Sequence, residues 1–293
     1  MELLCTLSKL ENFEKIINSG CDGIIFGSAF SLRFNYNLEQ FRLINDYCKK
    51  HNVKRYISID AMIFEDDRAS LYDYFDLLSE LNPDGIYFTD LGIISIAKRV
   101  NMTDKLIYDP DTLMTNSVDA AFYLKQNIGV VLARELSFSE VFNIIKRLPG
   151  QVDMQVFGHL KMSYSKRRFL SNYFKHIGTD YNVDGLKNIR IVEENRNYSL
   201  PIVEDHFGTR IYSDYVLMMY KELASLKGSI KRAIVDDSFV DSDIVFDVIK
   251  DIKRLTTDNA QFLQDTLVNK YPKEVFSNGY LDTKTTKTKE ENE

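Results

Sequence analysis

The fold is decided by a strand, a helix and a second strand in succession: Arg55-Tyr-Ile-Ser-Ile-Asp60, Leu71-Tyr-Asp-Tyr-Phe-Asp-Leu-Leu-Ser-Glu-Leu81 and Gly85-Ile-Tyr-Phe-Thr89. The two outer stretches are short and rich in β-branched and aromatic residues, which is typical of buried strands. The middle stretch repeats apolar residues at three- and four-residue steps, which is typical of an amphipathic helix. Two strands joined through a helix pair in parallel, so this unit predicts an α/β fold.

The same alternation runs from the first residue onward. Further strands are expected at Glu2–Thr6, Gly23–Phe26, Lys105–Tyr108, Ile128–Leu132, Val152–Phe157 and, much later, Ser229–Val235. Further helices are expected at Leu10–Asn18, Leu38–His51, Ile93–Val100, Val118–Gln126, Ser139–Leu148 and Ser242–Leu255. Eight strands, mostly each with its helix, predict a closed (β/α)8 barrel of the TIM type. The absence of Gly-x-Gly-x-x-Gly after the first strand argues against a Rossmann sheet.

One interval interrupts the pattern. Within residues 180–213, apolar and polar residues alternate, as in strands, on both sides of Asn195-Arg-Asn197. This pattern predicts a small antiparallel β insertion folded over one end of the barrel. A helix is expected over Asp214–Leu226. We therefore predict a barrel over residues 1–255 and a C-terminal extension over residues 256–293, with a disordered tail from about residue 282.

Composition limits the class of protein. The chain has 293 residues, 44% of them hydrophobic, and a net charge of −6, so any basic nucleic-acid footprint must be local. Its three cysteines (Cys5, Cys21 and Cys48) form no Cys-x-x-Cys and are expected to be reduced core thiols. No apolar run approaches the roughly 20 residues that span a bilayer, and the N-terminus has no basic leader. A cytoplasmic protein is expected.

A basic cluster directly follows the seventh predicted strand. Lys161, Lys166, Arg167 and Arg168 lie within eight residues, beside Ser163 and Tyr164. The carboxyl ends of barrel strands carry active sites, so these residues are candidates for binding phosphates and unstacked bases. The alternative is a solvated loop whose cations pair with nearby carboxylates.

Three further sites fall at the same end of the barrel. Arg134 and Glu135 close the sixth strand, where Arg134 either binds a phosphate or carboxylate and is positioned by Glu135, or forms an ion pair that seals the rim. Arg33 follows the second strand and is expected to converge on the same mouth. His159 either reaches the mouth or is a hydrogen-bonded structural imidazole.

Metal and nucleophile motifs are weak. Asp109, Asp111 and the run Glu65-Asp66-Asp67 are conceivable cation ligands, but Asp-Pro-Asp after a strand is also ordinary turn chemistry. The four histidines show no zinc-hydrolase spacing, and no Gly-x-Ser-x-Gly elbow is present. The sequence therefore predicts no metal site.

The segment Val156-Phe-Gly-His-Leu-Lys-Met-Ser-Tyr-Ser-Lys-Arg-Arg-Phe-Leu-Ser-Asn-Tyr173 resembles the signature of the collagenase-like peptidase family U-32. That signature has a Phe-Val-His-Gly-type start, a Cys, then Ser-Tyr-Ser-Gly-Arg and a second Cys. Lys161 and Arg168 stand at the two cysteine positions. Further resembling blocks occur in the family's order at Gly27–Phe41, Thr115–Ser117, Val131–Ser137, Pro201–Tyr212 and Phe276–Tyr280.

The resemblance carries functional implications. The chain is similar to the short members that occur beside a longer one in low-GC Gram-positive bacteria. The family was named for collagenase-like peptidase activity, and better-defined relatives act in oxygen-independent hydroxylation, including prephenate-dependent formation of 5-hydroxyuridine at the tRNA wobble position. Those relatives hold an iron–sulfur cluster on four cysteines, and clusters require thiolates. Because Lys161 and Arg168 replace two of them, no cluster is expected in this chain, only in a partner homologue.

Three hypotheses follow. The first is a cluster-less subunit that acts with a longer U-32 homologue on tRNA, with the cations and Arg33 holding phosphates or a carboxylate such as prephenate. Glu204 would then lie in a lid or partner surface formed by the insertion. The second is a peptidase, and the third is a non-catalytic module that binds a small molecule or partner protein. Whether this chain is itself an enzyme stays open at this point.

Overall fold

The computed structural model describes residues 1–34, 36–179, 181–194 and 198–283. Eight parallel strands form a ring in the order β11-β1-β2-β3-β4-β5-β6-β7, which closes because β11 also pairs with β7. This confirms the predicted TIM-like barrel. The ring strands are β1 (Glu2–Thr6), β2 (Gly23–Phe26), β3 (Lys54–Ile59), β4 (Gly85–Phe88), β5 (Leu106–Tyr108), β6 (Gly129–Val131), β7 (Val152–Ser165) and β11 (Arg232–Val235).

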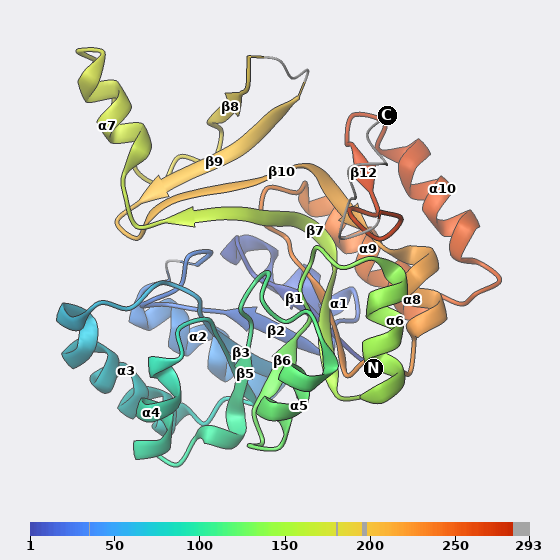
Figure 1. The fold of residues 1–293 in the computed structure, drawn as a ribbon, viewed down its shortest axis with the longest axis horizontal. Coiled ribbons are helices and arrows are strands. Elements are labelled where there is room, and N and C mark those ends of the chain that lie inside the picture. Colours follow the sequence, from blue (N-terminus) through green and yellow to red (C-terminus); the bar gives the residue numbers. More distant parts are fainter. Residues whose placement is uncertain (35, 180, 195–197, 284–293) are drawn as a thin grey trace.

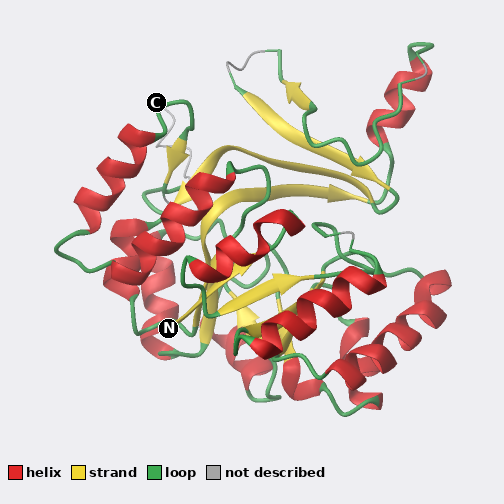
Figure 2. Ribbon diagram, turned by 180° about the vertical axis from the view of Figure 1, so that it is seen from behind, coloured by secondary structure: helices red, strands yellow, loops and turns green. Residues whose placement is uncertain are grey.

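Helices surround the ring (Figures 1 and 2). They are α1 (Phe13–Asn18), α2 (Leu38–Lys50), α3 (Arg68–Leu81), α4 (Gly92–Arg99), α5 (Ser117–Leu124), α6 (Phe138–Arg147), α8 (Tyr220–Leu226) and α9 (Ser242–Arg254). Side-chain caps begin several of these helices: the Asn116 side chain, for example, accepts from the backbone of Val118 and Asp119, and Ser137 forms a capping box with Glu140.

The core lies inside the ring and between the ring and its helices. Every residue of β2 and β4 is buried, as expected for strands covered on both faces. The three cysteines are buried and form no disulfide, and burial raises the pKa of the Cys21 and Cys48 thiols to about 12. They belong to the packing of the barrel, as predicted.

Strand β7 differs most from the prediction. It was expected to end at Phe157 but continues to Ser165, so the signature segment is largely a strand rather than a loop. Gly158 lies where β7 leaves the ring, with φ of +109°, and a Cβ there would come within 2.3 Å of the Asp236 carbonyl oxygen. Only glycine combines this conformation with so close an approach.

The strand extension continues into an arm, which we define as residues 158–218. Within the arm, the extension of β7 pairs antiparallel with β10 (Gly208–Met218). Strand β10 also pairs antiparallel with β9 (Ser199–Asp205), and β9 pairs antiparallel with β8 (Arg190–Val192). Helix α7 (Phe169–His176) projects from the arm, and the arm's long strands lie across one end of the barrel (Figure 1). The antiparallel insertion is confirmed, and its predicted turn at 195–197 lies outside the described residues.

The helix predicted over Asp214–Leu226 is wrong in its first half. Strand β10 runs to Met218, and α8 starts at Tyr220. The local sequence over Asp214–Met218 favours a helix, but pairing of β10 with β7 and with β12 (Phe276–Ser277) holds this segment in an extended conformation.

The C-terminal extension contains α10 (Ala260–Lys270), which packs against α8 and α9, and then β12. Its separation as a unit stays a prediction, and residues 284–293 of the predicted tail lie outside the described residues. Within the described ranges, no helix has both the length and the apolar character needed to cross a membrane.

Candidate functional site at the barrel mouth

Charged side chains gather at the carboxyl ends of the ring strands, beneath the arm. Arg33, Asp60, Asp109, Arg134 and Asp236 follow β2, β3, β5, β6 and β11, respectively. All five side chains are largely shielded from solvent. This is the end of a (β/α)8 barrel at which active sites form, because eight loops converge there. We call it the mouth.

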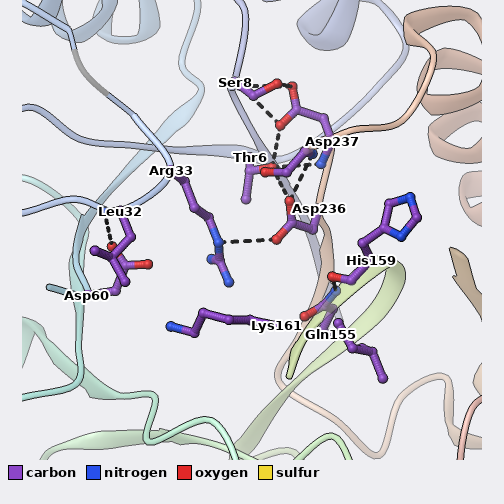
Figure 3. Close-up of polar contacts among 12 residues, drawn as sticks. Thr6, Ser8, Leu32, Arg33, Asp60, Gln155, His159, Lys161, Asp236 and Asp237 are labelled. Atoms are coloured by element: carbon purple, nitrogen blue, oxygen red, sulfur yellow. Dashed lines mark hydrogen bonds and ion pairs between the residues drawn. The ribbon is translucent and has the colours of Figure 1, made fainter. Parts of the chain in front are cut away.

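Arg33 points into the centre of the mouth (Figure 3). Its Nε lies 3.2 Å from Oδ2 of Asp236, and the two side chains are 8% and 2% exposed. Burial acts to lower the pKa of Arg33, but the carboxylates of Asp236 and Asp60 outweigh it and raise that pKa. Arg33 is therefore a fixed cation in the interior, as predicted for its position.

Asp237 ties the first and last ring strands together. Its carboxylate accepts hydrogen bonds from Thr6 Oγ1 at 2.6 Å, from the Ser8 backbone N–H at 2.8 Å and from Ser8 Oγ at 2.9 Å. Burial nevertheless raises the pKa of Asp237 to about 6, against the effect of these donors. The neighbouring Asp236 is thereby held in place beside Arg33.

Arg134 is satisfied on three sides. Its Nη2 donates to Asp109 at 2.8 Å, its Nη1 to Asp111 at 2.9 Å, and its Nε to Gln155 at 2.7 Å. Glu135 is exposed and does not position Arg134, so that part of the prediction is wrong. Both residues lie in a turn beyond the end of β6, where Arg134 is directed toward Asp109 and Asp111 and Glu135 toward solvent. Arg134 instead forms the buried rim network that the alternative described.

Lys161 also points inward. Its Nζ lies 2.9 Å from Asp111 Oδ2, and its side chain is only 3% exposed. Burial tends to raise the pKa of Asp111, but Lys161 and Arg134 together lower it. Asp109 and Asp111, considered above as metal ligands, are thus the counterions of two buried cations.

His159 behaves as a structural imidazole. Its Nδ1 donates to the backbone carbonyl of Ser213 at 2.7 Å, and burial lowers its pKa. The ring lies edge-on to Phe239, with 6.2 Å between centroids. The structural alternative fits this environment.

Arg168 does not join Lys161 at the mouth. Its guanidinium lies 2.8 Å from Asp184 and 3.4 Å from Glu204, both on the arm. Glu204 is fully buried and accepts the backbone N–H groups of Leu170 at 2.7 Å and Ser171 at 3.0 Å. The predicted convergence of Lys161 and Arg168 is therefore wrong, because β7 ends at Ser165 and the chain turns outward into α7, which Glu204 caps.

The remaining predicted residues line the outer edge. The Tyr164 hydroxyl donates to the Phe207 carbonyl oxygen at 3.0 Å. The Nζ of Lys166 lies 4.3 Å from the centre of the Phe64 ring and 3.7 Å from Oδ2 of Asp67. Ser163 and Arg167 are exposed. This edge faces solvent rather than the centre of the mouth.

Several residues at the mouth are missing from the prediction. Arg210, on β10, is 2% exposed and forms a bidentate pair with Asp205 at 2.8 and 2.6 Å. Asp236 and Asp237 directly follow the eighth strand, and that position alone could have indicated them. Nothing local distinguishes Arg210, because only pairing of β10 with β7 brings it there.

The described residues contain no group of three or more His, Cys, Asp or Glu side chains placed to hold a metal ion. The acidic run at Glu65–Asp67 is a short 3-10 turn before α3. Its carboxylates face solvent or, at Asp67, the backbone of Phe64.

Comparison with known sequences gives a consistent assignment. The model of peptidase family U32 matches residues 8–291. The tRNA hydroxylation protein P2 of Bacillus subtilis (strain 168) is 25% identical over 232 residues, which are 77% of this chain and 75% of that protein. The tRNA hydroxylation protein P1 of the same organism is 26% identical over 177 residues, 59% of this chain and 42% of that protein.

Other relatives are more distant. A collagenase of Porphyromonas gingivalis is 23% identical over 186 residues, 58% of this chain and 44% of that protein. Among solved structures, the U32 peptidase Mk0906 superimposes with a TM-score of 0.48 and 14% identity, covering 80% of this chain and 92% of that one. Since the family model matches nearly the whole sequence, the protein belongs to peptidase family U32.

Proposed function

We propose that this protein is a subunit without an iron–sulfur cluster that acts with a longer U32 homologue in the hydroxylation of tRNA wobble uridine. The main support for this proposal is the similarity of the chain to tRNA hydroxylation protein P2 along about three quarters of both chains. In this proposal the partner supplies the cluster, and prephenate and tRNA are the substrates.

The residues at the signature positions do not fit a cluster. Lys161 fills the first position with an ammonium bonded to Asp111, and Arg168 at the second position faces the arm. The thiols of Cys5, Cys21 and Cys48 are buried in the core, and burial raises the pKa of each. Clusters are bound by thiolates, so these features support placing the cluster in the partner.

The part of the arm that ends β7 and forms α7 has the composition of an RNA-contacting surface. Residues 162–179, beyond the buried Lys161, include four lysines and arginines and no Asp or Glu, although the whole chain has a net charge of −6. Phe169 and Tyr173 on α7 are 48% and 57% exposed, beside the exposed Arg167 and Lys175. Cations bind phosphates and exposed aromatic rings stack on unpaired bases, so this surface supports tRNA as the macromolecular substrate.

The test combines genetics and metal analysis. Deleting the gene should reduce 5-hydroxyuridine in total tRNA, measured by mass spectrometry of nucleosides, and expression of the gene should restore it. Co-expression with the longer homologue should give a stable complex that contains iron, whereas this chain purified alone should contain none. Unchanged 5-hydroxyuridine in a strain without a paralogous short member would refute the proposal.

The same experiment separates the other functions. A stable complex without any effect on tRNA modification would favour a non-catalytic binding module. Cleavage of a gelatin peptide by the purified chain, abolished by one substitution at the mouth, would favour a peptidase.

A further inference from the structure

The ladder between β7 and β10 is interrupted a short way beyond the barrel. Lys161 pairs with Tyr212, but the next pair along the ladder is Ser163 with Ile211, so Met162 has no counterpart on β10. An extra residue of this kind is a β-bulge, which bends its strand and breaks the regular hydrogen bonding of the ladder. The arm therefore has a locally weakened point at Met162.

The root of the arm, on the barrel side of this bulge, is firmly attached to the mouth. The Nζ of Lys161 lies 2.9 Å from Asp111, inside the buried network of charges. Tyr212 is 2% exposed, and its ring lies 4.7 Å from the ring of Phe239, in the loop after β11. These contacts hold the last residue pair before the bulge against two sides of the mouth, so a movement of the arm would begin at Met162.

Beyond the bulge, the arm has a structure of its own. We call this part, residues 163–211, the outer arm. Its ladder of β7 with β10 resumes over three residue pairs, and β9 and β8 continue the sheet. A small core of Leu170, Val183 and Ile202 joins α7 to these strands and is separate from the core of the barrel. The outer arm is therefore a body with internal packing and not a loose loop.

The far end of the outer arm touches the barrel through a few contacts on the rim, which we call the clasp. The Tyr164 hydroxyl accepts the backbone N–H of Met62 at 3.3 Å. The Nζ of Lys166 lies 3.4 Å from the Met62 carbonyl oxygen and 3.7 Å from Oδ2 of Asp67. It also lies 4.3 Å from the centre of the Phe64 ring. Contacts of this length on a partly exposed rim contribute little free energy each, so the clasp is weak.

An open cavity of about 360 Å³ lies between the outer arm and the mouth. Side chains of the outer arm line one side, and side chains of the barrel loops line the other: Val203, Asp205, Phe207 and Arg210 face Ser8, Arg33, Phe34 and Ser238. Ser238, in the loop after β11, is only 6% exposed although it lines the cavity. Access from solvent to this floor therefore depends on the position of the outer arm.

We propose that the outer arm is a hinged cover of the mouth, which turns about the bulge at Met162 and is held shut by the clasp. A fixed root, an interrupted ladder and a weak distal contact are the parts that such a movement requires, because a hinge concentrates the change of backbone angles in a few residues. Opening breaks the clasp and leaves the Lys161–Asp111 ion pair in place. The inference is independent of the proposed function, since it concerns access to the mouth and not the molecule that enters it.

Thiol labelling of the purified chain measures the opening. Cys5, Cys21 and Cys48 are buried, and burial raises the pKa of each, so these thiols react only when the barrel unfolds. Ser238→Cys adds one thiol that a bulky maleimide reaches when the outer arm opens. Where closing is faster than labelling, the labelling rate is proportional to the open fraction.

Two substitutions weaken the clasp in this Ser238→Cys background. Tyr164→Phe removes the hydroxyl that accepts from Met62 and keeps the ring, whereas Lys166→Gln removes the ammonium. Each should raise the labelling rate by about 3- to 10-fold, the effect of losing one hydrogen bond or one half-exposed cation contact. The matched controls are Tyr173→Phe and Lys175→Gln, which make the same chemical changes at exposed positions of α7 and should leave the rate unchanged.

Amide hydrogen exchange locates the movement. In Lys166→Gln the N–H of Met62 should exchange faster, because its acceptor Tyr164 moves away with the arm. The N–H groups of the outer ladder should keep their protection. Faster exchange throughout that ladder would mean that the outer arm unfolds and does not turn as a body, which would overturn the hinge.

The labelling result has two further contrary outcomes. Equal labelling rates in the clasp variants and the α7 controls would show that the clasp does not hold the mouth shut. Labelling of the three native thiols at the rate of Ser238→Cys would show that the mouth is exposed only by global unfolding. If Tyr164→Phe lowers the thermal stability of the whole chain, Lys166→Gln alone carries the test, since its side chain lies on the partly exposed rim.

Discussion

The Nζ of Lys161 lies 2.9 Å from Oδ2 of Asp111, so the seventh strand and the loop after the fifth strand share a buried ion pair across the barrel mouth. Arg134 donates to the other oxygen of Asp111 at 2.9 Å. Asp111 therefore neutralises two cations, whereas Lys161 has only this carboxylate as an ion-pair partner among the described residues.

That asymmetry predicts unequal effects of two substitutions. Asp111→Asn leaves Lys161 buried without a counterion and should lower the free energy of unfolding by about 3–5 kcal/mol. Lys161→Met leaves Asp111 paired with Arg134 and should lower it by only about 1–2 kcal/mol. Asparagine adopts a φ of +58° as readily as aspartate does, so backbone strain at position 111 does not contribute to the loss expected for Asp111→Asn. Urea unfolding measures both values, and equal losses would contradict the asymmetry. Glu65→Gln, at an exposed pair, is the control.

Asp237 predicts a pH dependence of stability. Burial raises its pKa to about 6 in the folded protein, above the ordinary value near 4 that it regains on unfolding. Between these values the folded state binds more protons than the unfolded state. The contribution of Asp237 to stability is therefore fully present below about pH 4 and is lost as the pH rises through about 6.

Asp237→Asn should remove this dependence. The difference in unfolding free energy between wild type and variant should change by on the order of 2–3 kcal/mol between pH 4 and pH 7, with wild type losing stability as the pH rises. Parallel stability curves across that range would show that Asp237 does not titrate there. The Asn side chain keeps an acceptor for the Ser8 N–H, so the loop contact is preserved.

Gly158 should be intolerant of any side chain. Gly158→Ala places a Cβ 2.3 Å from the Asp236 carbonyl oxygen, at φ of +109°. Strand β7 would have to move away from β11, and we expect a loss of at least about 3 kcal/mol in unfolding free energy. Gly178→Ala is the matched control, since its φ is +72° and no atom lies within 4 Å of the new Cβ. It should cost only about 1 kcal/mol. Similar losses in the two variants would show that β7 has room to shift.

The arm predicts a salt-dependent affinity for RNA. Replacing Lys166, Arg167 and Lys175 by Ala should weaken binding of a tRNA anticodon stem-loop and reduce the slope of log K against log salt by about 2–3, or nearly one for each lost phosphate contact. Arg168 is kept, because it pairs with Asp184 and Glu204 within the arm. Fluorescence anisotropy at several salt concentrations measures the slope.

A control variant tests whether charge alone explains that result. Lys49, Lys50 and Lys98 are exposed at the C-terminal ends of α2 and α4, on the outside of the barrel. Replacing these three by Ala removes the same total charge and should leave the slope unchanged. An equal reduction in both variants would mean that the arm is not the RNA surface.

The sequence by itself determined the barrel. Each strand and helix has its own periodicity, so seven βα units and a late eighth strand are visible without knowledge of their contacts. The positions of Arg33 and Arg134 at the mouth follow from the same pattern, because each lies in the loop that follows a ring strand. Local capping residues such as Asn116 and Ser137 likewise act on their own helices.

Only the tertiary structure decided which charges meet. Lys161 and Arg168 are seven residues apart in sequence, yet one is buried against Asp111 and the other faces Asp184. Local sequence did not show that β7 continues to Ser165, because that extension is stabilised by pairing with β10 about fifty residues later. Arg210 reaches the mouth by the same pairing. Periodicity reports local structure, whereas the partner of a buried charge depends on contacts between distant segments.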